Sequence, residues 1–110
     1  MWIDTHCHLD ASEFSGEENA IAERAAQQGV SCIVIPAIAR SNFSTVATLA
    51  HQQRNCTYAL GIHPIYVPQA EERDLAVLRE SIAAVLNDPR FVAIGEIGLD
   101  FFVPGLKDSP

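Results

Sequence analysis

The alternation of short apolar runs with longer amphipathic segments is the feature that most constrains the fold of this chain. Four runs are typical of strands: 3–10, 30–35, 57–62 and 91–94. Three segments between them have apolar residues at helical spacing: 18–28, 41–53 and 71–86. Strands that alternate with helices through short connections form parallel sheets with right-handed crossovers. The sequence therefore predicts an α/β fold built from (β/α) units.

Side-chain patterns within these segments predict their burial and their ends. The run 30–35 is apolar at nearly every position, as expected for a strand covered on both faces. Ser15 and Glu18 have the spacing of a capping box that opens the first helix, and Gly29 is expected to end it. The two later helices are expected to bury one stripe each: Phe43, Val46, Leu49 and Ala50, then Leu75, Leu78, Ile82, Val85 and Leu86.

Length and charge narrow the classes of protein that remain. A chain of 110 residues forms one domain at most, and both half of a (β/α)₈ barrel and a small open α/β sheet fit. The net charge is −7 with no basic run, which argues against a protein that holds DNA by phosphate neutralisation alone. A nuclease remains compatible, because bound divalent metal ions supply positive charge at a phosphate.

The cysteines and the apolar runs indicate the cellular compartment of the protein. Cys7, Cys32 and Cys56 are odd in number and form no C-x-x-C motif, which is typical of a reducing compartment. The start of the chain does not have the pattern of a signal peptide, and no apolar run approaches the length of a membrane span. We therefore expect a cytoplasmic protein without a membrane segment.

Residues suited to metal or acid–base chemistry lie at the ends of three of the four predicted strands. If the first run is extended, Asp4, His6, His8 and Asp10 share one face. His63 follows the third strand and Glu96 the fourth. Active sites of α/β folds gather beyond the carboxyl ends of the strands, so this placement predicts a metal-dependent active site. His51 falls inside a helix and is interpreted as an ordinary helix residue.

The residues alone leave several roles open. Glu96 is either a bridging metal ligand or a solvated loop acid, and the two histidines are either ligands or chance neighbours. His63 is suited to binding a substrate phosphate, to donating a proton, or to capping a strand end. Asp10 and Asp100 have the chemistry to orient histidine rings from outside the ligand set, or simply to face solvent. Tyr66, Phe101 and Phe102 are suited to lining a pocket, but core packing is the expected role.

Three motifs in order resemble the TatD family of metal-dependent hydrolases: D-T-H-C-H-L-D at the amino terminus, G-I-H-P in the middle, and G-E-I-G-L-D after the fourth strand. Members of that family are described as deoxyribonucleases with an amidohydrolase-like TIM barrel. The resemblance implies that His6 and His8 bind one divalent cation and that Glu96, a metal ligand and catalytic residue, bridges two cations (Mg, Mn or Zn). It also implies that His63 lies on the substrate side, that DNA is the substrate, and that a metal-activated water attacks the phosphodiester.

The chain departs from the family pattern in two respects. Phe101 stands where the family usually has tyrosine. A complete barrel needs about 250 residues, so residues 1–110 resemble its amino-terminal half, with about four strands and without the later histidine and aspartate ligands. We expect this half to be inactive alone and to self-associate or bind the remaining half. The alternatives are an amidohydrolase acting on a small amide or ester, and a non-catalytic fragment that only packs against a partner.

Overall fold

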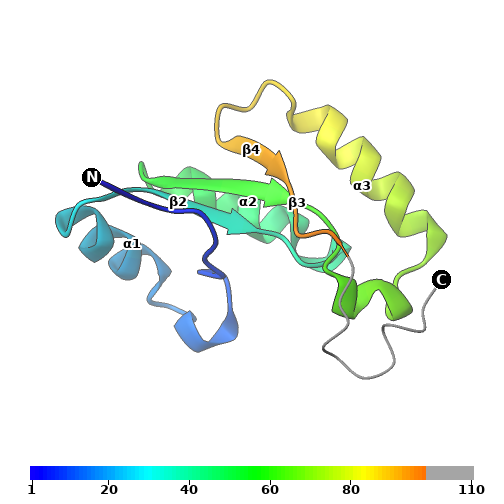
Figure 1. Cartoon of the computed structure of the whole chain (residues 1–110), viewed down its shortest axis with the longest axis horizontal. Helices are drawn as coiled ribbons and strands as arrows, with labels where there is room; N and C mark the ends of the chain where they lie inside the picture. The colour runs from blue at the N-terminus through cyan, green and yellow to red at the C-terminus, as the bar shows by residue number, and fades with distance from the viewer. Residues whose placement is uncertain (99–110) are drawn as a thin grey trace.

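Four parallel strands form one sheet in the order in which they occur along the chain (Figure 1). The computed structural model describes residues 1–98. Its strands are β1 (Trp2–Asp4), β2 (Val30–Pro36), β3 (Cys56–Leu60) and β4 (Phe91–Ile94), and its α-helices are α1 (Glu18–Gln27), α2 (Phe43–Gln52) and α3 (Glu72–Val85). Three short 3₁₀ turns complete it: η1 (Ser12–Phe14), η2 (Arg40–Asn42) and η3 (Pro64–Gln69). The predicted parallel (β/α) order is confirmed.

The core lies between the two central strands and α2. Ile35 of β2 and Tyr58 of β3 are completely buried. The stripe predicted for α2 is confirmed, because Phe43, Val46, Leu49 and Ala50 are all buried. Burial of this apolar surface against the sheet is the main force that holds the strands and α2 together.

The stripe predicted for α3 is wrong in part. Leu75 and Leu86 are 61% and 66% exposed, and only Leu78, Ile82 and Val85 pack against the core, each half-buried. In Figure 1, α3 lies beside β4 at the edge of the sheet. A pocket of about 370 Å³ lies between Val85 of α3 and Phe43 and Tyr58 of the core, so the stripe is not fully covered.

Two predicted ends also differ from the structure. The first strand ends at Asp4 instead of continuing to Asp10, because Asp4 Oδ1 accepts a hydrogen bond from His6 N (3.1 Å) and turns the chain. The capping box does not form, since Glu17 is the cap residue of α1 and Glu18 accepts from the backbone of Gly16 (3.2 Å). Gly29, with φ of 94°, follows the helix as predicted.

A polar network joins α2, β3 and the segment before β4, far from the carboxyl ends of the strands. Asp88 Oδ2 accepts hydrogen bonds from Tyr58 Oη (2.6 Å) and from His51 Nε2 (2.7 Å). Arg90 donates to the backbone carbonyls of Gln53, Arg54 and Cys56. His51 is thus an ordinary helix residue that has a structural partner. Over residues 1–98, no helix is long and apolar enough to cross a membrane.

Candidate functional site

The two histidines of the first motif lie just after β1 and project to one side. The backbone between them is held against the central sheet, because Cys7 N donates to Val34 O (3.0 Å). The Cys7 side chain packs against the core, and burial, together with the nearby Asp4 and Asp10, raises the pKa of its thiol. The rings of His6 and His8 meet edge to face on the opposite side, with their Nε2 atoms 3.2 Å apart.

Glu96 reaches these rings although β4 and β1 are the two outer strands of the sheet. After β4 the chain crosses the ends of its neighbours: Gly95 N donates to Leu60 O (2.8 Å), and Glu96 N donates to Ala37 O (3.1 Å). Leu60 ends β3 and Ala37 directly follows β2. This crossing moves the Glu96 carboxylate from the far edge of the sheet to the vicinity of β1.

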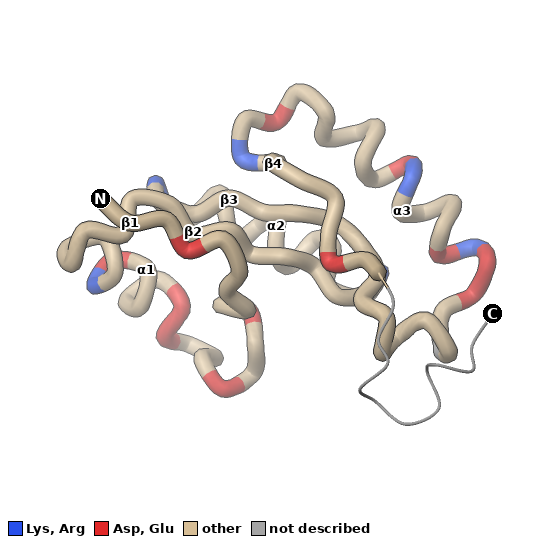
Figure 2. The backbone as a smooth tube through the Cα atoms, in the orientation of Figure 1, with Lys and Arg blue, Asp and Glu red and all other residues tan. Residues whose placement is uncertain are grey.

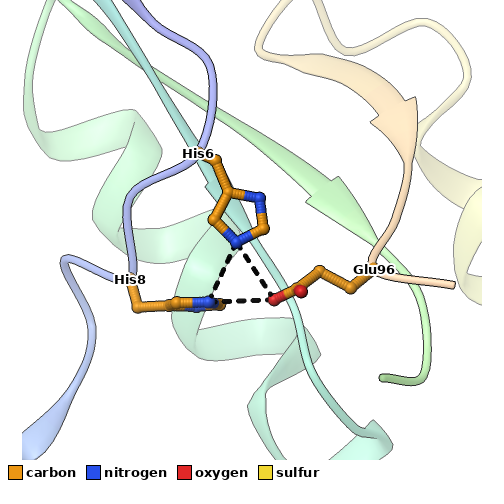
Figure 3. A group of neighbouring side chains, drawn as sticks. All are labelled: His6, His8 and Glu96. Carbon is orange, nitrogen blue, oxygen red and sulfur yellow. Dashed lines mark hydrogen bonds and ion pairs between the residues drawn. The ribbon is translucent and has the colours of Figure 1, made fainter. Parts of the chain in front are cut away.

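The carboxylate and the two rings form a compact group of three ligand atoms (Figure 3). Glu96 Oε2 lies 2.9 Å from His8 Nε2 and 3.5 Å from His6 Nε2. The three atoms lie within 4.8 Å of one another. The Glu96 side chain is only 16% exposed, whereas the His6 and His8 rings are 54% and 40% exposed. The group is therefore open on the histidine side and enclosed on the carboxylate side.

The group has the donor set of a divalent-cation site. Glu96 Oε2 is buried and, within the described part of the chain, accepts no hydrogen bond of good geometry, even though His8 Nε2 is close. A buried carboxylate oxygen without such a bond is costly unless another partner binds it. Imidazole nitrogens and a carboxylate oxygen are ligands for Zn²⁺, and carboxylates also suit Mg²⁺ and Mn²⁺. The arrangement thus fits a metal ion.

His63 contacts the other oxygen of the same carboxylate. Its Nε2 atom lies 3.2 Å from Glu96 Oε1, and its Nδ1 atom accepts a hydrogen bond from Ile65 N (3.1 Å). The sequence placed His63 near the site but did not predict this contact with Glu96. The available signal was that β3 and β4 are consecutive, since parallel neighbours bring their carboxyl ends together.

The other residues considered from the sequence have different surroundings. Asp10 Oδ2 accepts a hydrogen bond from Asn42 Nδ2 (2.9 Å), so its partner is a loop amide and not a histidine ring. Tyr66 lies beside His63, with ring centroids 6.4 Å apart, and lines a pocket of about 460 Å³. Asp100, Phe101 and Phe102 lie outside the described residues.

Comparison with known proteins places this geometry in context. The sequence is 42% identical to the uncharacterized metal-dependent hydrolase YjjV of Escherichia coli over 101 residues, which are 92% of this chain and 38% of that protein. It is 29% identical to the human deoxyribonuclease TATDN3, over 90% of this chain and 38% of that protein. The crystal structure of the E. coli TatD homologue YjjV superposes with a TM-score of 0.81 at 40% identity, covering 96% of this chain and 40% of that one.

These comparisons show the family of this chain and how much of its relatives' length it covers. The fold is that of the amino-terminal part of a TatD-type TIM barrel. The chain spans about 40% of the length of the relatives it matches. The family model described as TatD-related DNase matches residues 3–109. This chain therefore belongs to the TatD family.

Proposed function

We propose that this chain supplies part of the metal site of a metal-dependent hydrolase that cleaves phosphodiester bonds in DNA. The observation that carries the proposal is the convergence of His6, His8 and Glu96 on one point at the carboxyl end of the sheet. In the proposed site these residues would hold one divalent cation, Mg²⁺, Mn²⁺ or Zn²⁺, and Glu96 would also be a ligand of a second. Such a cation stabilises the charge of a phosphate and lowers the pKa of a water molecule.

The charge distribution supports a site that depends on cations. Figure 2 shows acidic residues along α1 and the segment before it and around the first turn of α3. Glu13, Glu17, Glu18 and Glu23 belong to the first group, and Glu71, Glu72 and Asp74 to the second. With a net charge of −7, the chain offers a DNA phosphate little attraction of its own. Bound cations would provide it at the site.

The names of two relatives support DNA as the substrate class. The human relative is named a deoxyribonuclease, and the bacterial relative is named a metal-dependent hydrolase. We propose that the substrate approaches past His63, which contacts Glu96, and past Tyr66, which lies beside His63 and lines the pocket next to η3. We also propose that residues 1–110 are the amino-terminal half of one barrel domain, whose other ligands come from outside this chain.

A chimera tests the proposed activity. Residues 1–98 would replace the matching amino-terminal part of E. coli YjjV, giving a complete barrel whose first four strands come from this chain. We expect release of nucleotides from DNA with Mg²⁺ or Mn²⁺, and loss of about 100–1000-fold or more in kcat for Glu96→Gln, on the scale of other losses of charge stabilisation. The matched control is Glu18→Gln, which changes an acid of α1 away from the site. Hydrolysis of small amides or esters without action on DNA would instead support an amidohydrolase.

A further inference from the structure

The ring of His63 accepts a hydrogen bond where a metal-binding histidine would donate one. A histidine that binds a metal through one ring nitrogen normally donates a hydrogen bond through the other. In His63 the other nitrogen, Nδ1, accepts a hydrogen bond from Ile65 N. A neutral ring that accepts at Nδ1 carries its proton on Nε2. His63 Nε2 therefore presents an N–H group, and that group lies 3.2 Å from Glu96 Oε1.

Gly61, two residues earlier, contacts the backbone of the same glutamate. A Cβ atom placed on Gly61 would lie 2.5 Å from Glu96 O and 2.6 Å from Gly95 C. Any side chain at this position would push the Gly95–Glu96 peptide away. The segment itself is fixed from the other side, because His63 N donates to Ile38 O (2.7 Å).

From these contacts we infer that the Gly61–Ile62–His63 segment positions Glu96. Gly61 sets how closely the Glu96 backbone approaches the end of β3, and the His63 N–H holds Oε1 so that Oε2 faces His6 and His8. His63 is then a positioning residue and not a ligand. Each carboxylate oxygen has two lone pairs, so this contact leaves Oε1 able to bind a further partner. The inference rests on the proposed metal site.

Zinc titration of the 110-residue chain tests the inference without any activity assay. We expect His63→Leu to weaken Zn²⁺ affinity about 10–100-fold, the usual effect of losing a residue that orients a ligand. His63→Gln, whose amide N–H reaches a similar position, is expected to retain most of the affinity. His51→Leu is the matched control, because His51 contacts Asp88 and lies outside the site. Circular dichroism checks that each variant is folded.

The outcomes separate this inference from the proposed function. Unchanged Zn²⁺ affinity in His63→Leu would overturn the positioning role, and so would equal weakening in His63→Gln and His63→Leu. If Glu96→Gln binds Zn²⁺ as tightly as the unaltered chain, the metal site itself is wrong. Should His63→Leu fail to fold, a long-range ¹H–¹⁵N spectrum of the unaltered chain still decides the matter. The Nε2–H tautomer of His63 is expected, and the Nδ1–H tautomer would contradict the inference.

Discussion

The central strands of this sheet are buried, whereas the outer strands are exposed and lead into the candidate site. Ile35 of β2 and Tyr58 of β3 are fully buried, whereas Trp2 of β1 and Ile94 of β4 are 72% and 55% exposed. The three candidate ligands nevertheless follow the two outer strands. The central strands are therefore the best-packed part of the molecule, and the candidate ligands follow its least-covered strands.

Backbone hydrogen bonds connect these two regions. Cys7 N donates to Val34 O, within β2, and Glu96 N donates to Ala37 O, directly after β2. The histidines and the glutamate are thus tied to the same central strand from opposite sides. The distance between the ligands depends on β2 more than on β1 or β4.

The largest expected effect is a loss of stability when a side chain of a central strand is truncated. Ile35→Ala removes a fully buried side chain and should lower the free energy of unfolding by about 2–5 kcal/mol. Ile94→Ala makes the same chemical change on the exposed β4 and should cost less than about 0.5 kcal/mol. Urea unfolding followed by circular dichroism measures both. Equal losses would show that the outer strand is as well packed as the centre.

Metal binding is expected to strengthen the outer strands most. Zn²⁺ at 100 times its dissociation constant should raise the free energy of unfolding by about 2.7 kcal/mol. Hydrogen exchange should slow most in residues 2–9 and 91–97, where local opening separates the ligands. The Glu96→Gln chain with the same Zn²⁺ is the control. A gain in protection confined to β2 and β3 would contradict a site between the outer strands.

Acid should weaken the network at the other end of the sheet. The hydrogen bond from Tyr58 holds the pKa of Asp88 at about 2, below its ordinary value of 3.8. Because the folded pKa is the lower one, this stabilisation is complete above pH 3.8 and is lost as the pH falls toward 2. Asp88→Asn should lower stability at pH 7 by roughly 1.5 kcal/mol and flatten its acid dependence. Glu23→Gln, an exposed acid of α1, should leave the acid dependence intact.

Substitutions on the two edge strands should change the stability least but should clearly reduce self-association of the chain. We expect the chain to self-associate, because β1 and β4 leave both edges of the sheet unpaired among residues 1–98. Trp2→Lys combined with Ile94→Lys should reduce the associated fraction in light scattering while shifting the unfolding free energy by only about 0.5 kcal/mol. A monodisperse monomer before the substitutions would contradict this expectation.

How far the sequence predicts this structure depends on how local each feature is. The alternation of parallel strands with helices, the buried face of α2 and β4 at 91–94 follow from periodicity, and the structure confirms them. The burial of α3 was overestimated, because a helical stripe does not reveal how much sheet lies beneath it. The Tyr58–Asp88–His51 network was not predicted, since its members come from separate elements and no motif joins them.

The candidate site was predictable only as a set of residues. Three motifs at strand ends indicated which side chains would meet, and the structure brings His6, His8 and Glu96 together. The sequence does not decide the role of His63, because that role depends on which ring nitrogen faces Glu96. That depends in turn on the Ile65 amide, whose direction is set by the turn after β3.

The convergence of β1 and β4 has a consequence for how the chain acquires its site. His8 and Glu96 come from opposite ends of the described chain and meet only after every intervening strand has docked. Contacts between distant positions carry a large loop-closure entropy, so they form late during folding. The candidate ligand group therefore forms only when all four described strands have docked. During synthesis, the three side chains of the proposed site can come together only after residue 96 has emerged from the ribosome.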